Sequence, residues 1–452
     1  MFWLELAVVL AAIFVGARLG GIGLGVMGGL GLAALTFVFH LQPTSPPIDV
    51  MLMIAAVVTA AGVLQAAGGL DYLVSVAERI LRSKPDAITF LGPLVTYTFT
   101  LFAGTGHVAY SVLPVIAEVA RETGVRPERP MAISVIASQQ AITASPISAA
   151  TVALLGMLGT GAAGAAFHIE LIDILKVCIP STLFGVLLAA FVSNRMGRDL
   201  AKDEDYLHRV EIGAAPAAGH HAPALTDGPV APPVSTRLAK IAVVIFLLAA
   251  VSVVLFGSFP AMRPEWKTAQ GMTKLGMPHV IEMVMLTAAA LMLLVCRVNV
   301  SRVVNGSVFL AGVQAVIAIF GIAWMGDTFF QGNMAFLSGN IKGMVTSAPW
   351  LFAFALFALS VLLYSQAATV RALMPLGISL GIPAPALMAM FPAVNGYFFI
   401  PNYPTIVAAI NFDRTGTTRI GKYVLNHSFM VPGLISTTGA VAFGFLLVRF
   451  LY

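Results

Sequence analysis

Long apolar runs recur from one end of the 452-residue chain to the other, and they restrict it to a membrane fold. The clearest are Ile22–Phe39, Val50–Ala67, Val177–Val192, Ile241–Phe256, Val280–Val295, Val308–Trp324 and Phe429–Val448. Most approach the roughly 17–25 residues that match the hydrocarbon thickness of a bilayer. Charged residues make up only 10% of the chain, against roughly 25% in soluble domains, so they are too few to cover a water-exposed surface. The sequence therefore predicts an integral membrane protein that crosses the bilayer many times.

The remaining composition excludes several classes of protein. The N-terminal run Phe2–Val15 has no preceding positive charge and is expected to be a short membrane helix without a cleavable signal. Cys178 and Cys296 lie in or beside apolar runs, which suggests neither a disulfide nor a metal framework. The net charge of +5 mostly reflects Lys and Arg in loops and does not indicate nucleic-acid binding. We expect no metal and no cofactor.

One central stretch, residues 193–237, is clearly aqueous. It combines a charge run, Arg198–Asp205, with Ala, Gly, His and Pro, a composition that need not fold. His220 and His221 have no partner ligands at metal-site spacing, so a flexible cytoplasmic linker is expected. It divides the chain into a first membrane half, residues 1–192, and a second, residues 238–452.

The two halves share matching features at a nearly constant offset, as an ancient internal duplication leaves behind. The matched pairs and their offsets are Asp71 and Asp327 (256), Pro114 and Pro375 (261), and Pro146 and Pro404 (258). The sequence therefore predicts two structural repeats.

Loop charges indicate that these repeats are inverted. The loop Arg121–Pro130 carries three arginines, whereas its counterpart Ser379–Pro385 carries no charge. The polarity reverses for Phe167–Asp173, which has no Lys or Arg although its counterpart around Arg414 is rich in them. Because Lys/Arg-rich loops are cytoplasmic, corresponding loops lie on opposite sides of the membrane and both termini are periplasmic. One loop, Gly257–Pro278, departs from this pattern, since it is expected outside yet carries three positive charges.

Each half is also expected to contain a hairpin that enters the membrane and returns. The apolar segment Ala87–Ala120 lies between two cytoplasmic loops, and its midpoint, Gly104–His107, suits a hairpin tip. The same reasoning gives Pro349–Ile378 a tip near Ser365–Thr369. The predicted fold is all-α, with about ten spans and two hairpins: each inverted repeat has about five transmembrane helices, one re-entrant hairpin and one broken helix.

Four clusters of small residues and proline fall at corresponding positions, one hairpin tip and one helix break in each half. Broken helices expose N–H groups with partial positive charge, which suits carboxylates, and freed carbonyls, which suit a small cation. The alternative is close helix packing by Gly, Ala, Ser and Thr, but it does not predict the register of the four clusters. The candidate binding residues are Thr105, Gly106, His107, Thr143, Ser145, Pro146, Ser365, Gln366, Thr369, Arg371, Tyr403 and Thr405.

Ionisable residues in apolar surroundings have two interpretations each. Arg371 is a candidate bidentate partner of a substrate carboxylate or a member of a structural ion pair. His107 either donates to a carboxylate or takes up protons, or simply packs. Asp71 and Asp327 are expected to cap or solvate helix ends near the interface. Glu118 is expected to be solvated, and Tyr397 and Asn402 are expected to add hydrogen bonds at the second break.

These same residues resemble a known family, the anaerobic C4-dicarboxylate transporters (the Dcu family) of bacteria. The similar stretches are Gly16–Gly23, Gly68–Tyr72, Gly104–His107, Ala141–Ala150, Tyr364–Thr369, Tyr403–Thr405 and Asp413–Lys422. The resemblance implies a transporter in the bacterial inner membrane that takes up fumarate, malate or aspartate in exchange for succinate. Phe39–Pro43 and Gly106-His107 look closer to the fumarate/succinate branch, and Tyr364–Thr369 to the aspartate branch.

We therefore expect an antiporter, not an enzyme, working by alternating access on small dicarboxylates in the lipid bilayer, with a homo-oligomer as a possible assembly. Cation-coupled uptake with Na⁺ or H⁺ is the alternative, and a passive anion channel would need no counter-substrate. A membrane hydrolase is disfavoured because no H-E-x-x-H motif occurs. An ATP-driven pump is disfavoured because no G-x-x-x-x-G-K-[ST] loop occurs.

Overall fold

The computed structural model describes residues 1–19, 22–46, 48–159, 169–218, 236–268, 271–333, 336, 348, 350–363, 365–401, 403–421 and 425–452. The first half consists of helices. They are α1 (Phe2–Leu19), α2 (Gly23–Phe37), α3 (Ile48–Ala66), α4 (Gly69–Ser83), η1 (Pro85–Ala87), α5 (Ile88–Ala103), η2 (Gly106–Val108), α6 (Ala109–Glu122), α7 (Glu128–Ala144), α8 (Ala149–Leu158) and α9 (Leu171–Ser193).

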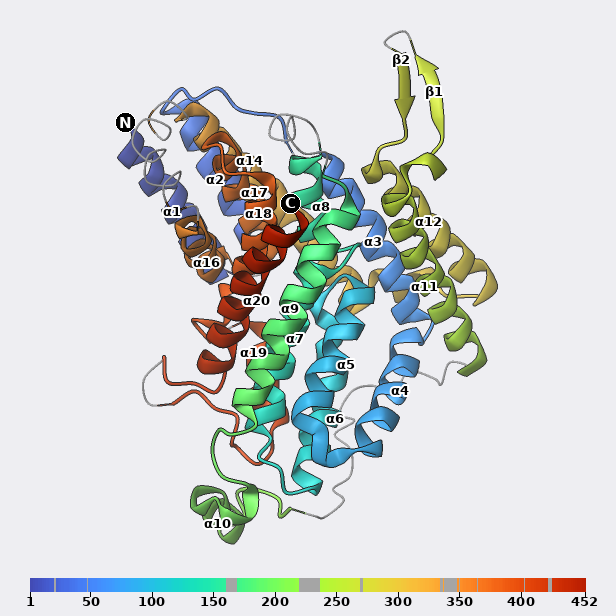
Figure 1. The fold of residues 1–452 in the computed structure, drawn as a ribbon, viewed down its shortest axis with the longest axis vertical. Helices are drawn as coiled ribbons and strands as arrows, with labels where there is room; N and C mark the ends of the chain where they lie inside the picture. Colours follow the sequence, from blue (N-terminus) through green and yellow to red (C-terminus); the bar gives the residue numbers. More distant parts are fainter. Residues whose placement is uncertain are drawn as a thin grey trace.

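The second half consists of helices and one β-hairpin. Its elements are α11 (Thr236–Ser258), η4 (Pro260–Met262), β1 (Glu265–Thr268), β2 (Gly271–Lys274), α12 (Met277–Val295), α13 (Val300–Val304), α14 (Ser307–Gly332), α16 (Leu351–Leu363), α17 (Gln366–Ser379), α18 (Ala384–Met390), η5 (Phe391–Val394), η6 (Gly396–Phe398), α19 (Pro404–Phe412) and α20 (Met430–Leu451). Both chain ends lie in the upper half of the view, and β1–β2 projects from the top (Figure 1).

Within the described residues, six helices or joined helix pairs are long and apolar enough to cross a membrane. They are Pro85–Ala103, Glu128–Leu158, Leu171–Ser193, Thr236–Gly257, Met277–Val295 and Met430–Leu451. The bent pair α3–α4 brings the number to as many as 7, and three further apolar helices are shorter, at Phe2–Gly16, Gly25–Phe37 and Leu351–Val361. A polytopic helical membrane protein is therefore the observed fold, and the total of about ten spans stays a prediction.

Gly68 separates α3 from α4. It adopts φ 74°, a left-handed conformation that glycine reaches without strain, and the chain bends by 71° at this break. Helix α4 is amphipathic and buries Leu70, Ala77 and Leu81. Asp71 therefore lies exposed in the first turn of α4, at a helix end as expected, although this helix continues to Ser83.

Asp327 departs from its expected position. It lies inside α14, which continues to Gly332, and so it does not end its helix. The helix extends beyond the apolar run Val308–Trp324 because the residues that follow remain on helical backbone.

Helices of the two halves pack on one another with exchanged roles. Helix α2 packs against α14 as α12 packs against α3. Helix α6 packs against α19 as α17 packs against α8. Helices α9 and α20 pack against each other, and they occupy equivalent places late in each half. This reciprocity is what an internal duplication predicts.

Glycines allow α2 and α14 to cross with their backbones in contact. A Cβ added at Gly321 would lie 1.7 Å from the carbonyl oxygen of Gly25, and one at Gly28 would lie 2.4 Å from the carbonyl carbon of Gly321. Neither approach leaves room for a methyl group, so the sequence of small residues in α2 fixes this crossing.

We therefore predict that Gly321→Ala forces α2 and α14 apart and destabilises the protein by roughly 1–3 kcal/mol, the usual cost of overpacking. The measurement is thermal unfolding of the purified protein in detergent. Gly29→Ala is the matched control, because a Cβ at Gly29 meets nothing within 4 Å. Equal melting temperatures for the two variants would contradict the prediction.

The β-hairpin β1–β2 corrects the all-α expectation. Glu265 to Thr268 pair antiparallel with Lys274 to Gly271. The hairpin belongs to the loop Gly257–Pro278 that departed from the charge pattern, and Lys267 and Lys274 lie on its strands. Glycine-bounded alternation over only four residues per strand is too short a signal to be separated from loop by sequence.

The expected flexible linker is also partly ordered. Residues 194–218, here called the clasp, contain η3 (Leu200–Lys202) and α10 (Glu204–Glu211) around a small core of Leu200, Tyr206 and Ala215. Tyr206 donates a hydrogen bond to the Pro216 carbonyl (2.8 Å), and its burial raises the pKa of the phenol above its ordinary value. The expectation of a flexible segment is wrong for this part, and His220 and His221 lie outside the described residues.

Arginines of the loop before α7 and of its first turn hold the clasp in place. Arg126 bonds both Glu128 (2.5 Å) and Asp203, and Arg129 bonds Asp199 (2.7 Å). Figure 1 shows α10 at the lower end, opposite β1–β2.

The clasp also contacts the loop before α20 and the end of α6. Arg209 donates to the Thr415 carbonyl (3.0 Å), and Arg121 donates to the Ala217 carbonyl. Arg121 also pairs with Glu118 (2.5 Å), so Glu118 is engaged in an ion pair and is not simply solvated. The clasp therefore joins loops of both halves at one end of the molecule.

Candidate functional site

The two hairpins turn at residues whose backbone conformation ends one helix and starts the next. Gly104 caps α5 with φ 70°, and a Cβ there would lie 3.0 Å from Ile147 in the first helix break. In the second hairpin, Ser365 is extended and its Oγ accepts a hydrogen bond from the Ala368 N–H (3.2 Å), which caps α17. Both tips therefore fall where the glycine and serine patterns predict them.

Proline sets both helix breaks. Ser145, which precedes Pro146, is extended with ψ 129°, as a residue before proline prefers. Tyr403, which precedes Pro404, is extended with ψ 139°, and Pro404 then occupies the first turn of α19. Ser148 caps the helix after the first break by accepting from the Thr151 N–H (3.1 Å). The two breaks are thus built by the same local rule.

Four helix beginnings consequently lie in the interior: α8 and α19 after the breaks, and α6 and α17 after the tips. Packing joins these helices in pairs, since α17 contacts α8 and α6 contacts α19. Each helix N-terminus carries roughly half a positive charge, and the caps Ser148 and Ser365 each satisfy only one N–H of a first turn. Their electrostatic sum favours an anion, and it needs no lysine or arginine at the centre.

A chain of buried side-chain amides links the two halves beside these helix ends. Gln366 Nε2 donates to Gln139 Oε1 (2.9 Å) and to Asn395 Oδ1 (3.1 Å). Asn395 Nδ2 donates to Gln140 Oε1 (3.2 Å), and Gln140 Nε2 donates to Thr437 Oγ1 (3.0 Å). The chain therefore runs from α7 through the start of α17 and the η5–η6 turn to α20.

Gly106 brings the first hairpin tip up to this amide chain. A Cβ at Gly106 would lie 2.3 Å from Gln139 Nε2, so the side chain of Gln139 lies directly against the glycine backbone. Gln139 thus contacts the tip of one hairpin through Gly106 and the tip of the other through Gln366. The two tips approach each other around a single glutamine.

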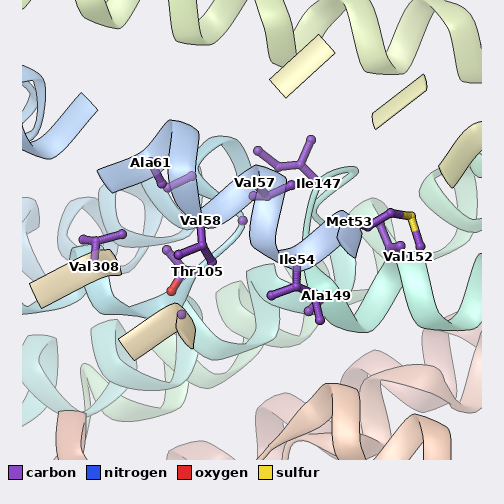
Figure 2. Close-up of a pocket in the computed structure, with 13 residues that line it drawn as sticks. Met53, Ile54, Val57, Val58, Ala61, Thr105, Ile147, Ala149, Val152 and Val308 are labelled. Atoms are coloured by element: carbon purple, nitrogen blue, oxygen red, sulfur yellow. The ribbon is translucent and has the colours of Figure 1, made fainter. Parts of the chain in front are cut away.

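A small cavity adjoins the first tip. It encloses about 100 Å³ and is lined by residues of α3, α14, the tip and the first break, with Thr105 as its polar side chain. Figure 2 shows the Thr105 hydroxyl at one side, facing Val58 and Val308, and Met53 and Val152 at the opposite side. A space of this size holds several waters. Because its walls are mostly apolar, they offer few partners to an anion, so this cavity suits passage of a substrate more than tight binding.

The candidate hydroxyls differ in what they bond. Thr143 Oγ1 donates to the Gln140 carbonyl (2.8 Å), and Thr369 Oγ1 donates to the Ser365 carbonyl (2.9 Å). Ser145 Oγ accepts from the Ile147 N–H (3.4 Å). Thr405 Oγ1 is buried at the start of α19 and has no hydrogen-bond partner within the described residues. Thr405 is therefore the hydroxyl most available to a ligand.

The other candidates are placed as follows. Arg371 lies half-buried in the second turn of α17, near the tip as expected. The Tyr403 ring lies 4.8 Å from that of Tyr397, whose hydroxyl donates to the Val135 carbonyl (3.4 Å). His107 lies in η2, and its side chain, like the whole of Asn402, falls outside the described part of the structure.

Sequence reasoning missed Gln139, Gln140, Asn395 and Thr437. A signal was present, since two adjacent amides within the apolar stretch Met131–Ile142 are costly in a membrane unless they are bonded. The predicted candidates lie at the hairpin tips and helix breaks, and Gln366 is the amide among them, so this criterion passes over amides inside a helix or in the η5–η6 turn. In the described residues, no group of three or more His, Cys, Asp or Glu is placed to hold a metal ion.

A helical membrane fold whose hairpins and broken helices enclose a buried polar centre has counterparts among solved transporters. The structure is similar to that of the YdaH transporter of Alcanivorax borkumensis (TM-score 0.58, 16% identity, covering 95% of this chain and 98% of that one). It is also similar to MtrF of Neisseria gonorrhoeae, described with a class of antimetabolite efflux pumps (TM-score 0.54, 13% identity, 92% of this chain and 84% of that one). At these identities the likeness concerns the fold, which is that of a polytopic membrane transporter.

Sequence comparison places the chain within this class. It belongs to the anaerobic C4-dicarboxylate membrane transporter family, whose model matches residues 1–452. It is 44% identical over 451 residues to the C4-dicarboxylate transporter DcuA of Wolinella succinogenes, with 100% of both chains covered. It is 41% identical over 449 residues to the anaerobic C4-dicarboxylate transporter DcuB of Escherichia coli O157:H7, covering 99% of this chain and 98% of that protein. The family resemblance found in the sequence motifs is confirmed.

Proposed function

We propose that this protein exchanges C4-dicarboxylates across the bacterial inner membrane, with fumarate, malate or aspartate entering and succinate leaving, by alternating access. Membership of the C4-dicarboxylate transporter family supports the substrate class. The observation that carries the proposal is the junction at Gln139, where both hairpin tips meet between helix N-termini of opposite halves. A site built this way opens to one side when one tip withdraws.

The charge of the substrate fits this centre. A dicarboxylate carries two negative charges, and the four helix beginnings each contribute roughly half a positive charge. One carboxylate would face α8 and α17, beside Ser145 and Gln366, and the other would face α6 and α19, beside Thr105 and Thr405. The interior amides and hydroxyls are neutral donors, so they bind a carboxylate less tightly than a buried lysine or arginine would. The substrate can therefore also leave the site.

Two inverted repeats account for the two access directions. The arms α5 and α6 lie in the lower half of the molecule and α17 in the upper half (Figure 1), so the hairpins approach the centre from opposite ends. The arginines beneath the clasp gather at the lower end. The positive-inside rule favours a cytoplasmic position for that end, which supports periplasmic termini.

The proposal predicts that Ser145→Ala combined with Ser365→Ala abolishes succinate/fumarate exchange while the protein still inserts normally. The two hydroxyls bond backbone N–H groups at the first break and the second tip. Losing each costs about 1 kcal/mol of local stability, which the fold tolerates. The measurement is counterflow in proteoliposomes preloaded with succinate, with labelled fumarate or aspartate outside, in the presence and absence of sodium.

Ser75→Ala combined with Ser83→Ala is the matched control. These two serines are exposed on α4, and each donates only to a carbonyl of its own helix. Unchanged exchange by the Ser145/Ser365 variant would overturn the assignment of the site. Uptake by the unaltered protein without internal succinate would overturn exchange in favour of coupled uptake if it needs sodium or a proton gradient, or of a channel if it needs neither.

A further inference from the structure

A second cavity lies between the β-hairpin loop and the start of α9, at the end of the molecule that carries both termini. It encloses about 220 Å³ and is lined by Glu170, Arg263, Met277 and residues of α3 and α8. Arg263 comes from the loop whose positive charge departed from the membrane-protein pattern. A positive charge of this loop, which the positive-inside rule does not explain, therefore lines a cavity.

Arg263 lies in the cavity wall, and some of its N–H donors have no hydrogen-bond partner within the described residues. Only 12% of its side chain is exposed, and one of its nitrogens, Nη2, lies 3.4 Å from Glu170 Oε1. Its Nε is buried and has no hydrogen-bond partner within the described residues. A guanidinium has five N–H donors in a planar fork that matches a carboxylate. The long contact with Glu170 occupies little of that capacity.

Glu170 is itself fixed by the helix it begins. It is the N-cap of α9, where its side chain accepts from the Asp173 N–H while Asp173 Oδ2 accepts from the Glu170 N–H (2.9 Å). This reciprocal capping box anchors Glu170 on α9. Glu170 is therefore a weak, stationary partner that a free carboxylate can replace at Arg263.

This cavity adjoins the one at the first hairpin tip. Met53 and Val152 line both cavities, and they form the shared wall between them. Figure 2 shows both side chains on the side of the view away from Thr105. Methionine is unbranched and adapts its shape readily, so Met53 suits a movable wall between the two spaces.

We propose that the cavity at Arg263 is an outer subsite that receives one carboxylate of a small aliphatic dicarboxylate before it passes Met53 and Val152 to the hairpin tip. This inference rests on the proposed function. It assigns to Arg263 a role in substrate affinity at one face of the membrane only, the face that carries the termini. Lys267, on the neighbouring strand β1, adds positive potential that draws anions toward the mouth, whereas Lys274 pairs with Glu265 (3.7 Å).

The test compares Arg263→Gln with Lys267→Gln, which removes the same charge from an exposed position of the same loop. In proteoliposomes of defined orientation, Arg263→Gln is expected to raise the KM for succinate at least about tenfold from the face bearing the termini. Its maximal rate and its KM from the opposite face should stay unchanged. Lys267→Gln should change the KM by less than about twofold, and salt should remove that effect.

A second variant guards against simple misfolding. Glu170→Gln keeps the oxygen that caps α9 but removes the charge that competes for Arg263, so it is expected to lower the KM from the same face. A damaged protein does not gain affinity.

Three results would overturn the inference. They are an unchanged KM in Arg263→Gln, an equal rise from both faces, and a rise in Glu170→Gln. Absence of succinate transport by the unaltered protein would overturn the proposed function and this inference with it, so the two failures are distinguishable.

Discussion

Replacing Gln366 by leucine is expected to lower dicarboxylate exchange by at least about a hundredfold. Its side-chain amide is the donor that holds Gln139 and Asn395 together between the second hairpin tip and the rest of the centre. Leucine has a similar volume but no donor, so two buried acceptors lose their partner at a cost of about 1–3 kcal/mol each. The second tip would lose its register against the first, and the helix ends would no longer face one substrate.

Gln331→Leu makes the same chemical change on an exposed position of α14 and serves as the control. Both variants are to be compared for insertion, for thermal unfolding in detergent and for counterflow with preloaded succinate. The expected pattern is normal insertion of both and loss of exchange in Gln366→Leu alone. Exchange by Gln366→Leu within about threefold of the unaltered protein would show that the amide chain does not organise the site.

Local chemistry explains why the tips and breaks were predictable from the sequence. Gly104 supplies a left-handed turn, and the prolines at 146 and 404 force the preceding residues out of helical backbone. These effects act within a few residues, so the pattern of small residues and proline located all four features. Neighbouring residues alone decide where an apolar run is interrupted, whereas the function of the interruption depends on distant parts of the chain.

The amide chain was not predictable, because it depends on distant residues. Gln366 and Gln139 are 227 positions apart, and Asn395 and Gln140 are 255 apart. The adjacent Gln139 and Gln140 and the tip residue Gln366 mark polar positions, but their partners lie in the other half of the chain or far along it. Only the packing of one half against the other decides whether such amides are bonded in the interior.

The order of the clasp also depends on distant residues, and so it could not be predicted from the local sequence. Its composition is typical of a chain that need not fold, and by itself it has only a three-residue core. What orders it lies outside it, in Arg121, Arg126 and Arg129, which the sequence marks only as a positive loop. The charge run of the clasp predicts an aqueous segment, but its arginine partners lie 70, 77 and 96 residues earlier in the chain than the clasp residues they bond.

Arg126→Gln is therefore expected to release the clasp. Arg126 is 12% exposed and bonds Asp203, which is 8% exposed, as well as Glu128. Removing one member of such a pair leaves a largely buried carboxylate without its cation, at a cost of about 3 kcal/mol. Asp203 also accepts from the Tyr206 N–H (3.1 Å) at the start of α10, so the helix loses its fixed cap.

Chymotrypsin cleavage after Tyr206 measures this opening, because the side chain of Tyr206 is only 2% exposed while the clasp is docked. If cleavage follows the population of the open form, Arg126→Gln should be cut about a hundredfold faster. Arg198→Gln is the control: its pair with Glu204 is long (3.4 Å) and exposed, so its loss should leave the cleavage rate unchanged. Equal rates in the two variants would mean that the clasp is held by its backbone contacts, such as Leu200 N–H to Gly124 (3.1 Å), and not by the buried arginine.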